Sequence, residues 1–194
     1  MTPEALPMQD AEVLLYRQFF TPDESDATLQ ALMDNIAWKQ ESIQVPGKRV
    51  PLPRLTAWYG DEGAGYKYSG LAQTPLPWTL TLSEIRQRIE VPAQTTFNSV
   101  LLNFYRSETD SVSWHADDEP ELGNVIASVS FGAVRQFQFK RIDDPKQKLS
   151  VDLPHGSLLI MRGATQRYWL HRIPKVSKPH PPRINLTFRT IQPQ

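Results

Sequence analysis

The sequence contains no cysteine among its 194 residues. This absence excludes disulfide bonds, thiolate metal ligands and a cysteine nucleophile, and it is compatible with a reducing compartment. We therefore expect the protein to act in the cytoplasm, or in the nucleus if its source is a eukaryote.

An excess of charge of one sign is also missing, since Lys and Arg number 21, as do Asp and Glu, and the formal net charge is +0. A nucleic-acid-binding role would therefore depend on local basic patches and not on bulk charge. Residues 1–10 carry two acids and two prolines without an apolar run, unlike a signal peptide or a membrane span. We expect no membrane association and a monomer.

The length suits one domain, which we place at residues 11–194 after a flexible tail at 1–10. Its first part, about 11–95, is helical and rich in loops. Thr21-Pro22-Asp23-Glu24 is typical of a helix start, and a second helix is expected over 77–90. Between them, residues 41–61 are expected to be extended with a turn at Pro46-Gly47, and 58–70 to form a loop that displays aromatic side chains.

The pattern becomes β in the second part, about 96–194. Candidate strands, separated by turn residues, cover 96–106, 124–131, 134–141, 148–153, 157–162, 167–171 and 183–191. Short strands at this spacing predict a sandwich or a jelly roll, with the two helices covering one sheet. The predicted fold class is mainly β with α (α+β).

The run Arg183–Arg189 alternates strictly, so that Ile184, Leu186 and Phe188 form one face of a strand. The opposite face carries two guanidiniums, an amide and a hydroxyl, spread over about 20 Å at ~3.3 Å per residue. These residues are Arg183, Asn185, Thr187 and Arg189. Forked cations and neutral donors suit a small ligand with two carboxylates. The alternative interpretation is an ordinary solvated strand face.

His115 and Asp117 lie two residues apart, so in extended backbone both side chains point the same way. This pair is weak evidence for a metal site until a third ligand is found, and His171, at the end of a predicted strand, is the candidate. Two imidazoles and one carboxylate form the facial triad of non-haem Fe(II) oxygenases, which leaves positions open for 2-oxoglutarate and O₂. Asn103 and Tyr105 share the same spacing and could face the same ligand.

The sequence resembles the AlkB family of Fe(II)/2-oxoglutarate-dependent oxygenases from about residue 50 to the C-terminus. The motifs that carry the resemblance are Asn103-x-Tyr105, His115-x-Asp117, Ala127-Ser-Val-Ser-Phe-Gly132, His155-Gly-Ser-Leu-Leu159, His171 and Arg183-x-Asn185-Leu-Thr187-x-Arg189. The resemblance implies a double-stranded β-helix, which is a jelly roll, with an N-terminal substrate-recognition extension. It also implies oxidative demethylation of alkylated bases such as 1-methyladenine and 3-methylcytosine, with release of formaldehyde, succinate and CO₂.

The resemblance also implies a role for each motif residue. His115, Asp117 and His171 would bind the iron. Arg183 would hold the distal carboxylate of 2-oxoglutarate, with Tyr105 nearby and Asn103 in support. Asn185 and Arg189 would lie closer to the iron-chelating end of the cosubstrate, and Thr187 completes the cosubstrate set.

An alkylated base must leave the stack to reach an iron. Trp58, Tyr66 and Tyr68, with Ser69, match the positions where family members hold the flipped base. Glu119 matches an acidic position near the lesion, where a carboxylate suits a cationic base. The alternative for Glu119 is a solvated member of an acidic run, and for the aromatic residues it is core packing.

Family members that repair duplex DNA carry an aromatic wedge where this sequence has Pro46, which predicts that single-stranded DNA is tolerated or preferred. Basic residues could line a phosphate-binding rim, or simply a soluble surface. They are Lys48, Arg49, Arg54, Arg162, Arg167, Arg172, Lys175 and Lys178. The rival hypotheses are the same chemistry on RNA, a protein or a small molecule, and a non-catalytic jelly-roll binding module.

Overall fold

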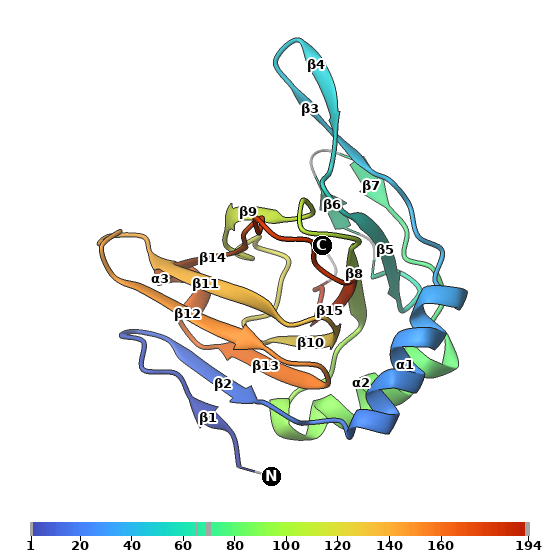
Figure 1. Cartoon of the computed structure of the whole chain (residues 1–194), viewed down its shortest axis with the longest axis horizontal. Helices are drawn as coiled ribbons and strands as arrows, with labels where there is room; N and C mark the ends of the chain where they lie inside the picture. Colours follow the sequence, from blue (N-terminus) through green and yellow to red (C-terminus); the bar gives the residue numbers. More distant parts are fainter. Residues whose placement is uncertain (1, 65, 69–70, 193–194) are drawn as a thin grey trace.

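The computed structural model describes residues 2–64, 66–68 and 71–192. It contains two facing antiparallel sheets and two short hairpins (Figure 1). In spatial order the major sheet consists of β1 (Glu4–Ala5), β2 (Glu12–Tyr16), β13 (Ser157–Arg162), β10 (Ile126–Gly132), β15 (Arg183–Arg189), β8 (Ser99–Tyr105) and β5 (Leu55–Gly60). The minor sheet consists of β12 (Lys148–Leu153), β11 (Arg135–Arg141), β14 (Trp169–Ile173) and β9 (Val112–His115). The predicted jelly roll is confirmed.

Two helices cover the outer face of the major sheet (Figure 1). α1 (Pro22–Asn35) begins at Thr21, whose hydroxyl accepts from the Glu24 amide while the Glu24 side chain accepts from the Thr21 amide. α2 (Leu80–Ala93) buries the predicted stripe of Leu82, Ile85 and Ile89. A single turn, α3 (Thr165–Tyr168), precedes β14.

The alternation of β15 is central to the fold. Ile184, Leu186 and Phe188 are fully buried in the core between the major sheet and the helices. The polar residues of β15 face the other way, toward the space between the two sheets. A second apolar cluster, which includes Phe137, Phe139 and Leu159, fills part of that space. The remainder is an open cavity, described below.

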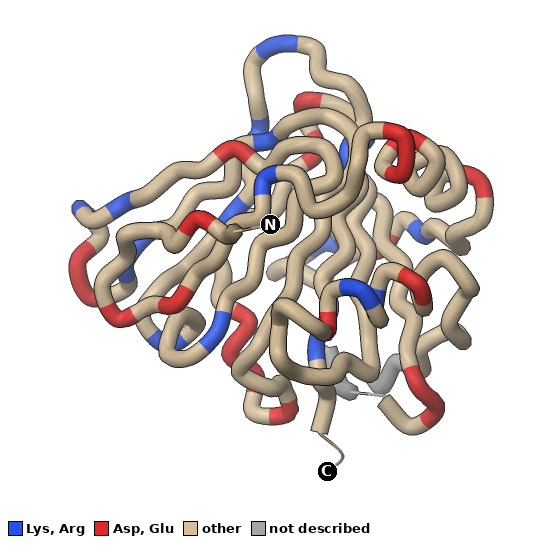
Figure 2. The backbone as a smooth tube through the Cα atoms, turned by 90° about the horizontal axis from the view of Figure 1, so that it is seen from below, with Lys and Arg blue, Asp and Glu red and all other residues tan. Residues whose placement is uncertain are grey.

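The two short hairpins lie in the N-terminal part of the chain. β3 (Ser42–Val45) and β4 (Lys48–Pro51) pair around the predicted turn, where Gly47 has φ +80°. Figure 1 shows this hairpin projecting away from the sheets. β6 (Tyr66–Tyr68) pairs with β7 (Leu71–Gln73). Acidic and basic positions are interspersed along the chain (Figure 2). None of the helices in the described ranges has the length and apolar character of a membrane span.

Two predictions about local structure were wrong, and one strand was missed. The predicted flexible tail at 1–10 is wrong for its described residues 2–10, because β1 pairs with β2 and the side chains of Leu6 and Met8 are buried in the second apolar cluster. The displayed loop predicted over 58–70 does not begin at Trp58, because Trp58 and Tyr59 belong to β5 and Tyr59 lies in the core. Strand β9 was not predicted, although His115 is its last residue.

Candidate metal and cosubstrate site

The three predicted metal ligands converge at one edge of the minor sheet. His115 ends β9 and pairs directly with His171 of β14, and the two imidazole centroids are 4.2 Å apart. Asp117 follows β9, and its carboxylate oxygens lie 4.0 Å from His115 Nε2 and 3.7 Å from His171 Nε2. One ligand atom from each residue lies within 4.8 Å of the other two. This arrangement can hold a single ion.

The protonation states of these residues favour metal binding. Burial alone would raise the pKa of the Asp117 carboxyl, but the Arg189 guanidinium and the two imidazoles outweigh it and hold that pKa well below its usual range. Burial and the neighbouring His115 lower the pKa of His171 to about 3. An ionised carboxylate and a neutral imidazole are the forms that ligate a metal.

The orientation of His115 supports the same assignment. Its Nδ1 lies 2.8 Å from the Ser113 carbonyl oxygen. A proton on Nδ1 is donated to that carbonyl, which leaves the Nε2 lone pair directed at Asp117 and available to a metal. Two imidazoles and one carboxylate, with no sulfur ligand, fit Fe(II) in a non-haem facial triad.

The polar face of β15 is buried and not solvated. Its side chains border a cavity of about 320 Å³, which the three metal ligands also line. The register between β15 and β8 places Arg183 opposite Tyr105 and Asn185 opposite Asn103. Residues distant in sequence therefore meet around one cavity. The alternative interpretation, that the polar face of β15 is an ordinary solvated strand face, is excluded.

Arg183 has unused hydrogen-bonding capacity. It is 1% exposed, and Nη2 donates to Ser130 Oγ at 2.9 Å. Nε and Nη1 are buried and have no partner in the described part of the chain. Burial lowers the pKa of Arg183 to about 10, so the guanidinium is still charged at neutral pH. A buried cation with unsatisfied donors calls for an anionic ligand such as a carboxylate of 2-oxoglutarate.

The other predicted cosubstrate residues also border the cavity but differ in their partners. Asn185 donates to Ser128 Oγ and the Val129 carbonyl, and its Oδ1 accepts from the Thr187 hydroxyl, so both side chains are engaged in the cavity wall. Arg189 Nη2 donates to Asp117 Oδ1 at 2.5 Å, at the metal end of the cavity. Asn103 is 6% exposed and borders the cavity, where its Oδ1 accepts from Arg54.

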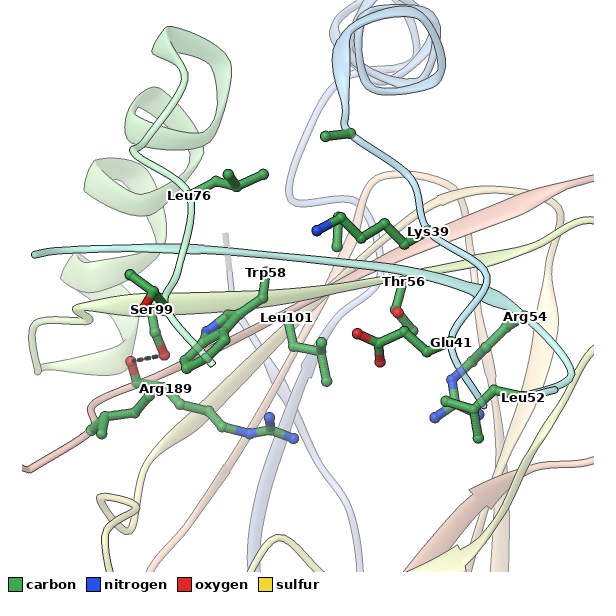
Figure 3. Close-up of a pocket in the computed structure, with 14 residues that line it drawn as sticks. Lys39, Glu41, Leu52, Arg54, Thr56, Trp58, Leu76, Ser99, Leu101 and Arg189 are labelled. Atoms are coloured by element: carbon green, nitrogen blue, oxygen red, sulfur yellow. Dashed lines mark hydrogen bonds between the residues drawn. The ribbon is translucent and has the colours of Figure 1, made fainter. Parts of the chain in front are cut away.

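The predicted substrate residues fall in different places. Glu119 lines the metal cavity, and its Oε2 is buried without a partner among the described residues. Trp58 instead lines an adjoining cavity of about 110 Å³ (Figure 3). That cavity shares Leu52, Arg54, Leu101 and Arg189 with the metal cavity. Tyr66 and Tyr68 form the ends of β6, but their side chains lie outside the described part. Ser69 lies outside the described residues altogether.

Several of the basic residues assigned to a phosphate rim have partners within the fold. Arg162 donates to Glu12 Oε1 from Nε at 2.6 Å, and Arg54 points inward to Asn103. Arg172 and Lys140 both lie over the Trp114 ring, at 4.4 and 4.5 Å from its centroid. Because Arg162 and Arg54 are engaged in the fold, they are poor candidates for binding phosphates.

Sequence reasoning missed several residues that shape the site. Phe137 stacks on His171 at 5.2 Å between ring centroids, and Arg135 lies buried beside Tyr105. Ser128 and Ser130 support the polar face of β15. Their alternation with apolar residues in β10 is a period-2 signal that could have identified them.

A jelly roll with a His-x-Asp and distant His triad, and a buried arginine facing the same cavity, defines a non-haem iron oxygenase that uses a 2-oxo acid. The model of the 2OG-Fe(II) oxygenase superfamily matches residues 12–189. The chain belongs to this superfamily and, within it, to the AlkB family.

The chain is also similar to individually named relatives. It is 45% identical over 194 residues to the mouse (Mus musculus) alpha-ketoglutarate-dependent dioxygenase alkB homolog 3, covering 94% of this chain and 67% of that protein. It is 40% identical over 188 residues to the human (Homo sapiens) DNA oxidative demethylase ALKBH2, covering 91% of this chain and 72% of that protein. The chain thus spans about two thirds of the first relative. The solved structure of OsALKBH1 shares the fold, with a TM-score of 0.69 at 19% identity over 96% of this chain and 100% of that one.

Proposed function

We propose that this protein demethylates N-alkylated bases such as 1-methyladenine and 3-methylcytosine in DNA, using Fe(II), O₂ and 2-oxoglutarate and releasing formaldehyde, succinate and CO₂. The observation that carries the proposal is the single cavity that joins the His115, Asp117 and His171 triad to the unsatisfied guanidinium of Arg183. The proposal extends to a monomeric protein in the cytoplasm, or in the nucleus of a eukaryote. Relatives named as DNA oxidative demethylases support the substrate class.

Six residues that line the cavity have defined tasks in this proposal. His115, Asp117 and His171 hold Fe(II), and Arg183 binds the distal carboxylate of 2-oxoglutarate. When bound, the iron and 2-oxoglutarate supply the oxidation of the alkyl carbon by O₂. Phe137 and Met161 line the same cavity and limit the access of water. The oxidised carbon leaves as formaldehyde, and the base is restored.

Glu119 provides selectivity for a cationic lesion in this proposal. Its Oε2 is buried in the metal cavity and has no partner in the described chain, so a positively charged base would satisfy it. We expect Glu119→Gln to lower kcat/KM for 1-methyladenine about tenfold more than for the neutral lesion 1-methylguanine, equivalent to about 1.4 kcal/mol. Glu121→Gln, in the same acidic run but outside the cavity lining, is the matched control. Equal losses on both lesions would rule out the charge-recognition role.

The β3–β4 hairpin is relevant to whether the protein prefers single-stranded or double-stranded DNA as its substrate. Its tip contains Pro46 and Gly47, with no aromatic side chain to fill the gap that a flipped base leaves in a duplex. We expect formaldehyde release from a single-stranded oligonucleotide carrying 1-methyladenine to exceed release from the matched duplex severalfold. The measurement is the ratio of the two rates at equal lesion concentration. A duplex rate equal to or above the single-strand rate would contradict this assignment of the hairpin.

A further inference from the structure

Arg54 lies between β4 and β5, at the base of the projecting hairpin. Its Nε donates to Asn103 Oδ1 at 2.7 Å, and its Nη1 donates to the Ser111 carbonyl oxygen at 3.3 Å. It borders both the metal cavity and the adjoining cavity, and Figure 3 shows it on the side of the adjoining cavity opposite Trp58 and Arg189. Arg54 therefore stands at the boundary between the hairpin and the site.

The contact with Arg54 determines how the Asn103 amide is turned. A guanidinium only donates hydrogen bonds, so the atom that faces Arg54 must be the amide oxygen. The Asn103 Nδ2 group then has no hydrogen-bond partner within the described structure, and the side chain borders the metal cavity. In this orientation Asn103 presents two N–H donors to a ligand. With the amide flipped, it would present an acceptor and repel a carboxylate.

The backbone around Arg54 is held in place independently of the side chain. Gln40 Nε2 donates to the carbonyls of Leu52 and Arg54, and Gln40 Oε1 accepts from Arg106. Thr56, two residues further on, pairs with the backbone of Lys39. The Arg54 side chain thus extends from a fixed segment, which is the condition for orienting another side chain.

Arg54 also adds positive charge to the cavity. It has no acidic partner among the residues that the structure describes, since both of its hydrogen-bond acceptors are neutral oxygens. Arg183 is likewise without an acid in the described chain, and two of its buried donor atoms, Nε and Nη1, have no partner there. These two cations, which have no acidic partner in the described structure, favour an anionic group beside them in the cavity.

We propose that Arg54 is a positioning residue for the dicarboxylate cosubstrate. It holds the Asn103 amide with the NH₂ group toward the cavity, and Asn103 then donates to the cosubstrate. This inference rests on the proposed cosubstrate role of Asn103, and it gives Arg54 a task within the site in place of the phosphate-binding task suggested by its basic side chain alone.

The test is a double-mutant cycle on 2-oxoglutarate binding, measured by calorimetry on protein loaded with Mn²⁺ without O₂, so that no turnover contributes. We expect Arg54→Met and Asn103→Ala each to raise the Kd about tenfold. Because the two residues act through one contact, their effects should not multiply. The Kd of the double variant for 2-oxoglutarate should lie within twofold of the higher of the two single-variant values. Arg49→Met, an exposed residue of the same hairpin, should leave the Kd unchanged.

The outcomes separate the inference from the proposed function. If the wild type binds 2-oxoglutarate and the losses of the two single variants multiply in the double variant, Arg54 does not act through Asn103 and the inference is wrong. An unchanged Kd for Arg54→Met would also overturn it. If Arg54→Met melts well below the wild type, the Arg54→Lys variant is used in the cycle in its place. Lysine keeps the positive charge but lacks the Nε–H group that contacts Asn103, so the Kd should still rise. A wild type that fails to bind 2-oxoglutarate would refute the proposed function itself.

Discussion

Replacing Asp117 with alanine is expected to abolish formaldehyde release and to lower the stability of the protein. The carboxylate is a predicted iron ligand, so its removal leaves two imidazoles and an incomplete triad. It also accepts from Arg189 at 2.5 Å, where both side chains are about 9% exposed. Removing one partner of a buried ion pair typically costs about 3–5 kcal/mol. We expect turnover below detection and a fall of that order in the free energy of unfolding, measured by urea denaturation of the metal-free protein.

Asp152→Ala is the matched control, because Asp152 lies exposed on β12 of the same sheet. It should retain activity and stability within about 0.5 kcal/mol. An active Asp117→Ala variant would contradict the metal assignment. An inactive variant of unchanged stability would leave Asp117 as a ligand and remove the structural role given to its pair with Arg189.

Replacing Arg183 with methionine separates cosubstrate binding from stability. We expect the KM for 2-oxoglutarate to rise about 100-fold, equivalent to about 2.8 kcal/mol, because the buried guanidinium loses its charge-assisted bonds to the carboxylate. The unliganded variant should melt at or above the wild-type temperature, since an apolar side chain replaces a buried cation that has unsatisfied donors. The measurements are succinate formation as a function of 2-oxoglutarate and thermal melting of the unliganded protein.

Arg167→Met controls for the loss of a cation, since Arg167 is exposed on α3. It should leave the KM for 2-oxoglutarate within twofold of the wild type. An Arg183→Met variant with a wild-type KM would show that the distal carboxylate binds elsewhere. A variant with a wild-type KM and a lower melting temperature would make Arg183 a purely structural residue.

The strands that carry the site were predictable because their periodicity is unusually clean. In β15, apolar and polar residues alternate over the whole strand, so the pattern alone gives both the core face and the cavity face. Asn103 and Tyr105 follow the same rule on β8. The placement of His171 beside His115 needed a hypothesis about chemistry, because no local pattern pairs β14 with β9.

The features that sequence reasoning missed depend on contacts between distant segments. Leu6 and Met8 are buried because β1 adds to the edge of the major sheet. A strand of two residues is too short to give a recognisable sequence pattern. From the sequence, Arg54 is interpreted as a surface cation. Only the contact of its side chain with Asn103 in the structure shows that it faces the site. Glu12 forms an ion pair with Arg162 across the β2–β13 pair. A count of Lys and Arg residues in the sequence therefore overestimates the positive charge that is available to bind nucleic acid.

The most direct test of the account is formaldehyde release from a single-stranded oligonucleotide carrying 1-methyladenine, with Fe(II) and 2-oxoglutarate, by wild type and by His171→Ala. His171 is 4% exposed and contributes one of the three converging ligand atoms. The account predicts stoichiometric formaldehyde and succinate from the wild type and neither from the variant. Succinate without formaldehyde from the wild type would contradict the proposed DNA substrate, and equal release by the variant would contradict the metal site.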